Sequence, residues 1–206
     1  KTIFTGTVGD NRKAVVYGEG KVEKVFFKIP IGEGSYQLVR HEKKALEYIT
    51  SLGLESIVYP RIIDGYNLVA LSDVSDEKCK PYGAVDYRAV ALYEELYVNT
   101  KVLLNFSELA TNRHINIQWV EYIEQVKCLS NQSLMRGLID LLSQCQLTYS
   151  EFKGSEIECC FSHGDFTPWN CFYSQRSLIV IDWELSGNYP LFFDIIHHIV
   201  STHTLI

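Results

Sequence analysis

The stretch from His163 to Glu184 constrains the fold of this 206-residue chain more than any other. It opens with the loop-like block HGDFTPWN at residues 163–170. The apolar, β-branched run at residues 177–181 follows a turn-like segment and predicts a short buried strand. One carboxylate, Asp165, is therefore expected on a loop, and a second, Asp182, at the end of the neighbouring strand.

The spacing of three polar residues in this stretch suits phosphoryl transfer. Asn170 follows Asp165 by five residues, and Asp182 follows Asn170 by twelve. Transfer from a nucleotide needs one carboxylate to orient and deprotonate an acceptor hydroxyl, and an amide oxygen and a second carboxylate to hold Mg²⁺. We therefore predict that Asp165 is catalytic and that Asn170 and Asp182 bind Mg²⁺. Each residue alone also suits a backbone-bonding role in a turn; the joint spacing, which matches the protein-kinase catalytic loop, favours the kinase interpretation.

The residues around this set point to small-molecule kinases. His-Gly-Asp-Phe-x-x-x-Asn followed by Ile-Asp-Trp-Glu resembles the aminoglycoside phosphotransferase and choline kinase family, which has a protein-kinase-like fold. The family pattern continues with a Gly, a Pro and an Asp, as Gly187, Pro190 and Asp194 do here. The resemblance extends over about residues 1 to 200, with motifs dense only from 161 to 196.

This resemblance implies supporting roles for three further residues. His163 resembles the family's loop histidine, which orients the loop, and Asp194 would accept hydrogen bonds from the loop backbone or from His163. Glu184 stands where protein kinases have a glycine, and it would contact a second metal, a water or the acceptor. Thr167 replaces a protein-kinase lysine, so both departures favour a small-molecule kinase.

The beginning of the chain predicts a nucleotide-binding sheet. Short apolar runs separated by glycine-containing turns indicate strands at residues 3–4, 14–17 and 25–29. In the first turn, Gly6 and Gly9 would let backbone N–H groups approach the nucleotide phosphates. A simple turn is an equally good interpretation, because the full G-x-G-x-x-G pattern is missing.

Lys28 and Glu42 form a predicted ion pair. Residues 37–52 are expected to form an amphipathic helix, and Glu42 falls on its apolar stripe. A carboxylate on a buried face needs a partner, and Lys28, which ends the preceding strand, is the obvious one. In kinases this pairing positions the lysine on the nucleotide phosphates. The alternative is that Glu42 lies at the edge of the stripe and is solvated.

The fold class expected from these elements is α+β, a two-lobed protein-kinase-like fold. Strands at 56–59 and 67–71 would complete a five-stranded antiparallel sheet with one helix, and Ala70 and Ser72 would meet the adenine edge through their backbone. The expected domains are a nucleotide-binding lobe with its hinge at residues 1–73 and a helical catalytic lobe at residues 74–206. Apolar stripes in the second lobe predict helices at residues 85–97, 117–128 and 134–145.

Composition narrows the function classes. A net charge of −6 without runs of Lys and Arg argues against a nucleic-acid partner, and no stretch is apolar for long enough to span a membrane. Six cysteines without a C-x-x-C pair indicate a reducing compartment, so a cytoplasmic location is expected. The family usually continues beyond this point, so exposed apolar surface in the second lobe would be covered by a homodimer or by further chain.

The predicted function is transfer of the γ-phosphate from ATP, or from GTP, to a hydroxyl of a small molecule with the help of Mg²⁺. A sugar or other polyol, an aminoglycoside or a choline-like amino-alcohol all fit the resemblance, and a polyol is preferred because no strong acidic cluster marks a polycation site. The alternative is a nucleotide-binding pseudokinase or scaffold without turnover, which the incomplete glycine pattern leaves open.

Overall fold

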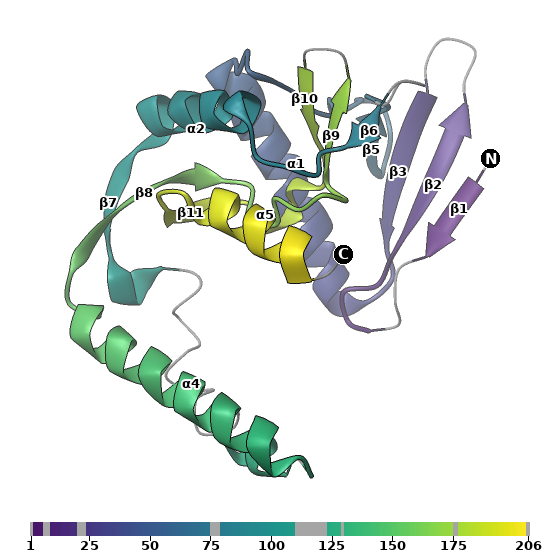
Figure 1. The fold of residues 1–206 in the computed structure, drawn as a ribbon. Helices are drawn as coiled ribbons and strands as arrows, with labels where there is room; N and C mark the ends of the chain where they lie inside the picture. The colour runs from purple at the N-terminus through teal and green to yellow at the C-terminus, as the bar shows by residue number, and fades with distance from the viewer. Residues whose placement is uncertain are drawn as a thin grey trace. The chain divides into compact units, whose positions relative to one another are not determined.

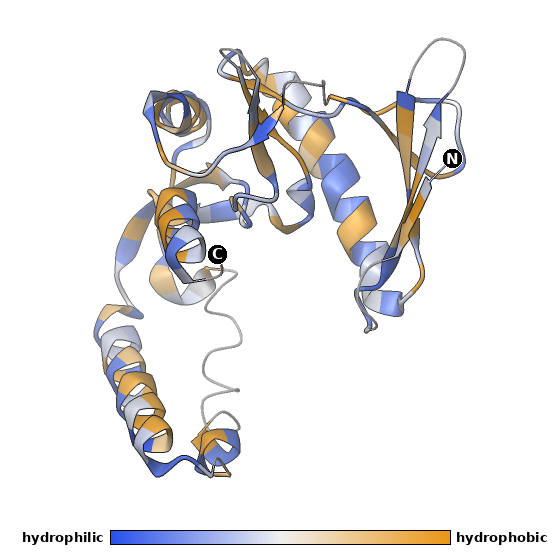
Figure 2. Ribbon diagram, turned by 45° about the vertical axis from the view of Figure 1, so that its right-hand side comes forward, coloured by the Kyte–Doolittle hydropathy of each residue, from blue (hydrophilic) through white to orange (hydrophobic). Residues whose placement is uncertain are grey.

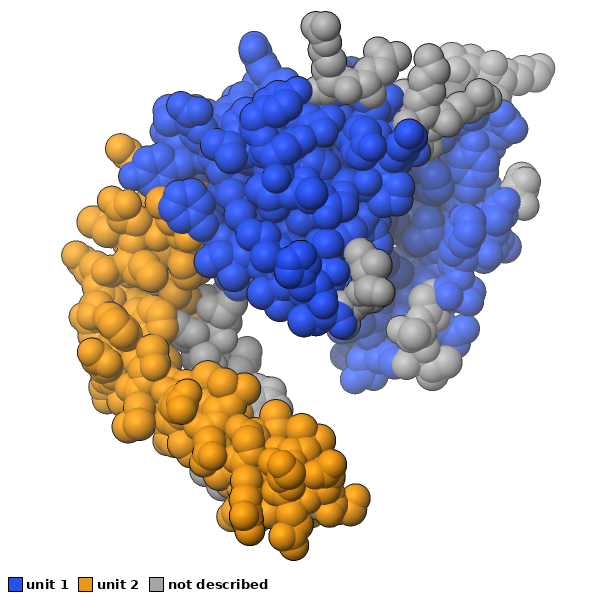
Figure 3. All heavy atoms as spheres, in the orientation of Figure 1, with its two compact units in different colours: residues 1–100, 161–187, 192–206 blue, residues 101–160, 188–191 orange. Residues whose placement is uncertain are grey.

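The computed structural model describes residues 2–5, 9–19, 24–74, 79–109, 123–128, 130–174 and 177–204. The chain forms two compact units, coloured separately in Figure 3. Unit 1 comprises residues 1–100, 161–187 and 192–206, and unit 2 comprises residues 101–160 and 188–191. All the predicted site residues within the described ranges belong to unit 1. Gly6 lies outside the described residues.

The first sheet of unit 1 has four antiparallel strands in the order β1-β2-β3-β5 (Figure 1). They are β1 Thr2–Thr5, β2 Lys13–Glu19, β3 Lys24–Pro30 and β5 Val69–Ser72. Lys28 lies in a central strand, opposite Val15 on one side and Val69 on the other. The strands predicted at 3–4, 14–17 and 25–29 are thus present and adjacent.

The predicted fifth strand of this sheet is not confirmed among the described residues. The segment expected to supply it contains β4 Ile57–Val58, which pairs in parallel with β10 Ser177–Val180. A second four-stranded sheet results, in the order β4-β10-β9-β6, with β9 Cys171–Ser174 and β6 Lys80–Pro81. This pairing sets Ile57 opposite Leu178, and both side chains are buried in the core. Burial of Ile57 therefore favours β10 as the partner of this short strand.

Helix α1 Glu33–Leu52 forms because its apolar residues recur at helical spacing. Val39, Ala45, Leu46 and Ile49 are buried, and Figure 2 shows the alternation of hydrophobic and hydrophilic bands along the helix. The helix ends at Gly53, which adopts the left-handed conformation that commonly terminates helices. It begins four residues earlier than the predicted start at residue 37.

The start of α1 is fixed against the turn that precedes β2. Ser35 N–H donates to the carbonyl of Asp10, and Gly32 N–H donates to the carbonyl of Arg12. A Cβ atom at Gly32 would lie 2.2 Å from the Asp10 oxygen, so only glycine permits this approach. The turn before β2 is thereby attached to the helix that carries Glu42.

Unit 1 also contains α2 Tyr87–Thr100 and α5 Phe193–Thr204. Helix α2 covers most of the helix predicted at 85–97 and extends beyond it. Leu92 and Leu96 of α2 pack into one core with residues of α1, β10 and the 163–170 loop, from which Phe166 is fully buried. The core therefore includes Phe166, the residue that follows Asp165 in the loop.

Unit 2 contains β7 Val102–Asn105, most of β8 Glu156–Ser162 and α4 Gln132–Phe152. β8 is the central strand of a three-stranded sheet with β7 and β11 Gly187–Pro190. The predicted helix 134–145 lies within α4, whereas residues 117–122 of the predicted helix 117–128 lie outside the described residues. None of the helices in the described part of the chain is long and apolar enough to cross a membrane.

Candidate active site

The 163–170 loop connects β8 to β9 and is held by Asp194 at the start of α5. The Asp194 carboxylate accepts hydrogen bonds from the backbone N–H groups of His163, at 2.7 Å, and Gly164, at 2.9 Å. Gly164 has φ 83°, a conformation that favours glycine. Asp194 is buried, so both ends of these bonds are shielded from water and the loop is fixed in place.

His163 joins the loop to the strand that leads to Asp182. Its Nε2 lies 2.8 Å from the carbonyl oxygen of Ile181, and its Nδ1 accepts a bond from Asp165 N–H at 3.2 Å. A carbonyl only accepts, so this arrangement assigns the proton to Nε2 and leaves the imidazole neutral. His163 therefore orients the loop through both ring nitrogens.

Asp165 and Asn170 are joined by hydrogen bonds within the loop, where Asp165 is partly exposed and Asn170 is buried. Asn170 Nδ2 donates to Asp165 Oδ2 at 2.8 Å and to the Asp165 carbonyl at 3.0 Å. The side-chain nitrogen of Asn170 is thus engaged by Asp165. Its side-chain oxygen is the atom that could bind a cation. The Asn170 carbonyl accepts a bond from Ile181 N–H at 2.9 Å, which joins this pair to the segment carrying Asp182.

Asp182 stands in an uncommon backbone conformation two residues after the end of β10. Its φ of 65° and ψ of 59° lie in the left-handed region, which Asp tolerates better than most residues. The next residue, Trp183, is fully buried, stacks on Phe161 and donates from its ring nitrogen to the Val180 carbonyl. This anchoring holds Asp182 in its strained conformation, in which its carboxylate reaches Lys28 and Lys13.

Lys28 forms ion pairs with Glu42 and Asp182. Its Nζ lies 2.6 Å from each carboxylate, and Glu42 is completely buried. Burial would lower the pKa of Lys28, but the two carboxylates more than offset this and raise it above its usual value. Burial would likewise raise the pKa of Asp182, yet Lys28 and Lys13 lower it to about 2. Lys28 and Asp182 are therefore charged at neutral pH, whereas burial raises the pKa of Glu42 and the adjacent Lys28 ammonium opposes that rise.

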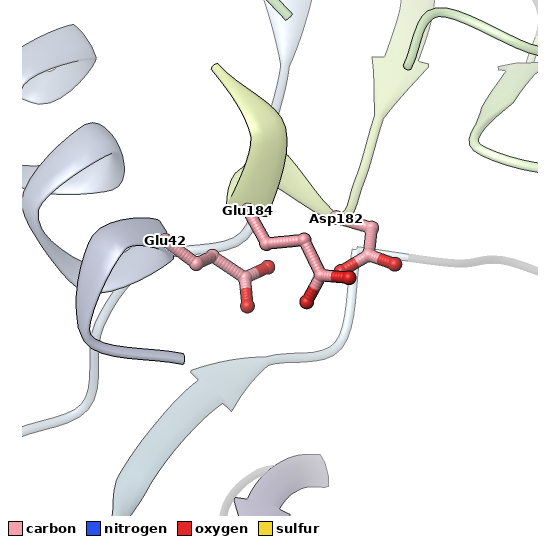
Figure 4. Close-up of side chains that lie close together, drawn as sticks. All are labelled: Glu42, Asp182 and Glu184. Atoms are coloured by element: carbon pink, nitrogen blue, oxygen red, sulfur yellow. The ribbon is translucent and has the colours of Figure 1, made fainter. Parts of the chain in front are cut away.

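Three carboxylates converge beside Lys28. The ligand atoms of Glu42, Asp182 and Glu184 lie within 4.8 Å of one another, and Figure 4 shows the side chains turned toward a common point. A bond from His41 Nε2 of α1 to the carbonyl of Ser186 ties the segment around Glu184 to the helix of Glu42. Hard oxygen donors of this kind fit Mg²⁺, and Asp182 and Glu184 would hold it, since both are partly exposed whereas Glu42 is completely buried.

A cavity of about 380 Å³ in unit 1 ends at these charged groups. Its walls are mainly apolar, with Val15 and Phe26 from the first sheet and Phe172 and Ile179 from the second. Lys28 and other charged residues line its polar end: Lys13, Glu42 and Asp182. An apolar slot with charges at one end suits a ligand that joins a flat ring to an anionic tail.

The predicted adenine contacts lie beside this cavity but are largely engaged within the chain. The Ala70 carbonyl accepts from Ile63 N–H, and Ser72 N–H donates to the Arg61 carbonyl, both at 2.8 Å. Ala70 is fully buried, whereas Ser72 lines the cavity. Gly9 closes a tight turn by accepting a bond from Arg12 N–H.

Lys13 is a charged residue of the site that the sequence analysis missed. It forms ion pairs with Asp182 and Glu184 from the start of β2. The signal was available: β2 side chains alternate between faces, and Lys13 shares its face with Val15, which lies opposite Lys28. A lysine at that position would line the same cavity as Lys28.

Residues 109–205 match the model of the phosphotransferase enzyme family named APH. No curated protein matches the chain significantly. Among solved structures, the APH(2'')-IIa ternary complex with streptomycin and ATP has a TM-score of 0.62 and 14% identity, covering 94% of this chain and 69% of that one.

Two other solved structures share the fold. Glucosamine kinase has a TM-score of 0.55 at 10% identity, covering 92% of this chain and 54% of that chain. Choline kinase from Cryptosporidium parvum has a TM-score of 0.57 at 14% identity, covering 98% and 63%. The resemblance to the aminoglycoside phosphotransferase and choline kinase family, with its protein-kinase-like fold, is thus confirmed.

Proposed function

We propose that this protein is an ATP- and Mg²⁺-dependent phosphotransferase that acts on a hydroxyl of a small molecule. The family match and the kinase neighbours support the coarser statement, a small-molecule phosphotransferase. The dependence on ATP and Mg²⁺ rests on one observation: the buried Lys28 lies 2.6 Å from both Glu42 and Asp182, at the charged end of an apolar cavity. A kinase needs such a lysine, fixed by carboxylates, to hold the phosphates of a nucleoside triphosphate.

The proposed roles follow from position. Lys28 holds the nucleotide phosphates, and Glu42 keeps the Lys28 ammonium in place. Asp182 and Glu184, with Asn170, bind Mg²⁺, which when present shields the charge between the phosphates. Asp165 takes the proton of the acceptor hydroxyl, while Asn170 Nδ2 orients its carboxylate. His163 and Asp194 position the loop and touch neither reactant.

The nucleotide-binding residues would come from residues 1–73 and the catalytic residues from residues 74–206. We propose ATP as the donor, because one neighbour was solved with streptomycin and ATP, although GTP would fit the same charges. The acceptor is a sugar or polyol, an aminoglycoside or an amino-alcohol, the classes represented among the neighbours. Backbone groups beyond Ser72 would meet the adenine, since those of Ala70 and Ser72 are engaged.

A screen of hydroxyl acceptors with ADP release as readout tests the proposal. Wild-type protein should release ADP with at least one sugar, aminoglycoside or amino-alcohol, and Asp165→Asn should lower that rate by about 10²-fold or more while nucleotide affinity stays nearly unchanged. Asp140→Asn, on the exposed part of α4, is the matched control and should keep the wild-type rate. A wild-type rate in Asp165→Asn would refute the assignment, and nucleotide binding without turnover on any acceptor would favour a pseudokinase.

A further inference from the structure

Lys13 holds the two carboxylates that are proposed to bind the metal. Its Nζ lies 3.1 Å from Asp182 Oδ1 and 3.4 Å from Oδ2, and it is also paired with Glu184. The side chain is only 16% exposed. An ammonium group therefore stands between the oxygen atoms that suit a divalent cation.

The two lysines of the site have different surroundings. Lys28 is shared between Glu42 and Asp182, so it stays fixed when Asp182 acquires another cation. In the described part of the chain, the Lys13 ammonium is paired with Asp182 and Glu184 alone. A cation that takes these two carboxylates therefore deprives Lys13 of both partners.

The charge of the site opposes the binding of a metal ion in the absence of a nucleotide. Together, Lys13 and Lys28 neutralise all but one of the charges of Glu42, Asp182 and Glu184. A divalent cation beside the Lys13 ammonium would be repelled at close range in a partly buried setting. Free Mg²⁺ must therefore displace Lys13 before it can bind.

A bound nucleotide offers Lys13 a new partner. Lys13 and Val15 lie on the same face of β2 and both line the cavity, whose polar end also contains Lys28. A lysine has a flexible four-carbon stem, so its ammonium can move from carboxylates to nearby phosphate oxygens. The phosphates would restore the charge balance that the metal disturbs.

We propose that Lys13 is a placeholder cation: it occupies the metal position between Asp182 and Glu184 in the nucleotide-free protein and moves to the nucleotide phosphates when the metal–nucleotide complex binds. Metal and nucleotide then enter together rather than one before the other. This inference rests on the proposed function and adds a positioning residue that controls the order of binding.

Two binding measurements on Lys13→Met test the inference, because they should change in opposite directions. The nucleotide-free variant should bind Mn²⁺ at least about five-fold more tightly than wild type. Electron paramagnetic resonance of the free Mn²⁺ ion measures this affinity. Affinity for Mg²⁺-ATP, measured by calorimetry, should become at least about five-fold weaker. A merely structural lysine would weaken both.

Two variants serve as controls. Lys13→Arg keeps the positive charge and should restore both affinities toward wild type. Lys43→Met removes an exposed lysine that pairs with Glu47 on α1, and it should change neither. Lys13→Gln is a second neutral variant, used if thermal melting shows that Lys13→Met does not fold.

The outcomes separate this inference from the proposed function. If wild type binds Mg²⁺-ATP but the neutral Lys13 variants bind Mn²⁺ no more tightly than wild type, the placeholder role is wrong and the phosphotransferase proposal stands. A loss of both affinities also overturns it. If wild type binds no Mg²⁺-ATP at all, the proposed function fails together with the inference.

Discussion

Glu42 shows how one residue links the fold to the site. It is fully buried in α1, and Lys28 is its partner at 2.6 Å. A buried ion pair adds little to stability as a whole, but removal of one member leaves an uncompensated charge and costs about 3–5 kcal/mol. Glu42 therefore contributes to stability, and in the proposed function it also serves nucleotide binding by holding Lys28.

We expect Glu42→Gln to lower the free energy of unfolding by about 2 kcal/mol in chemical denaturation, because Lys28 loses its completely buried partner while Asp182 still compensates part of its charge. Glu47→Gln is the matched control on the same helix: its side chain is 57% exposed, and the change should cost no more than about 0.5 kcal/mol. Equal effects of the two substitutions would show that the burial of Glu42 does not determine the loss of stability.

The site residues differ in how far the sequence could predict them. The Lys28 and Glu42 contact followed from a charge on an apolar stripe, and the Asp165 and Asn170 contact from a fixed spacing in one loop. The alternation of β2 could place Lys13 on the face of Val15, but not its pairing with Asp182 and Glu184, because these partners lie about 170 residues away and no local pattern encodes that distance. The left-handed conformation of Asp182 was also not predicted, since Asp occurs in many ordinary turns.

At the scale of single elements, the start of α2 depends on Asp86. The Asp86 carboxylate accepts a bond from Arg88 N–H at 2.9 Å, as a helix N-cap does, and it also accepts bonds from the Arg88 guanidinium and the Tyr82 hydroxyl. The Arg88 bonds, with help from Tyr82, lower the pKa of Asp86 to about 2, although partial burial acts in the opposite direction.

This lowered pKa predicts a pH dependence of stability. A carboxyl group with a folded pKa of about 2 and an unfolded pKa of 3.8 stabilises the fold above about pH 4, and this contribution disappears as pH falls toward 2. Asp86→Asn keeps a capping oxygen but loses the charge. In denaturation series, we expect it to be about 1 kcal/mol less stable than wild type at pH 7, with the difference vanishing near pH 2.

Asp86→Ala separates the cap from the charge. It loses both, so it should keep a deficit of about 1 kcal/mol at low pH, where the protonated wild-type side chain still caps the helix. If Asp86→Asn instead remained equally destabilised from pH 7 to pH 2, the ionic contribution of Arg88 would be negligible.

Elements defined by local patterns were predicted well, and pairings between distant segments were not. Helix α1 follows from its own spacing of apolar residues. β4 is two residues long and pairs with β10, and β7 pairs with β8 across α4. Such pairings depend on which strands the rest of the chain brings together, and a two-residue strand carries no period that could reveal its partner.

At the scale of the whole chain, the described residues that line the cavity all belong to unit 1. Ligand binding stabilises the regions that contact the ligand. We therefore expect Mg²⁺-ATP to slow hydrogen exchange in β3, α1 and β10 of unit 1, while α4 of unit 2 exchanges at its free rate. Equal protection of α4, measured by mass spectrometry, would contradict a nucleotide site confined to unit 1.

The central claim is that Asp182 and Lys28 form a site for a metal–nucleotide complex. Calorimetric titration with ATP, in the presence and absence of Mg²⁺, tests this most directly on wild type and Asp182→Asn. We predict that Mg²⁺ tightens ATP binding to wild type by about ten-fold or more and leaves binding to Asp182→Asn nearly unchanged. Wild-type affinity that does not respond to Mg²⁺, or an undiminished Mg²⁺ effect in Asp182→Asn, would contradict the claim.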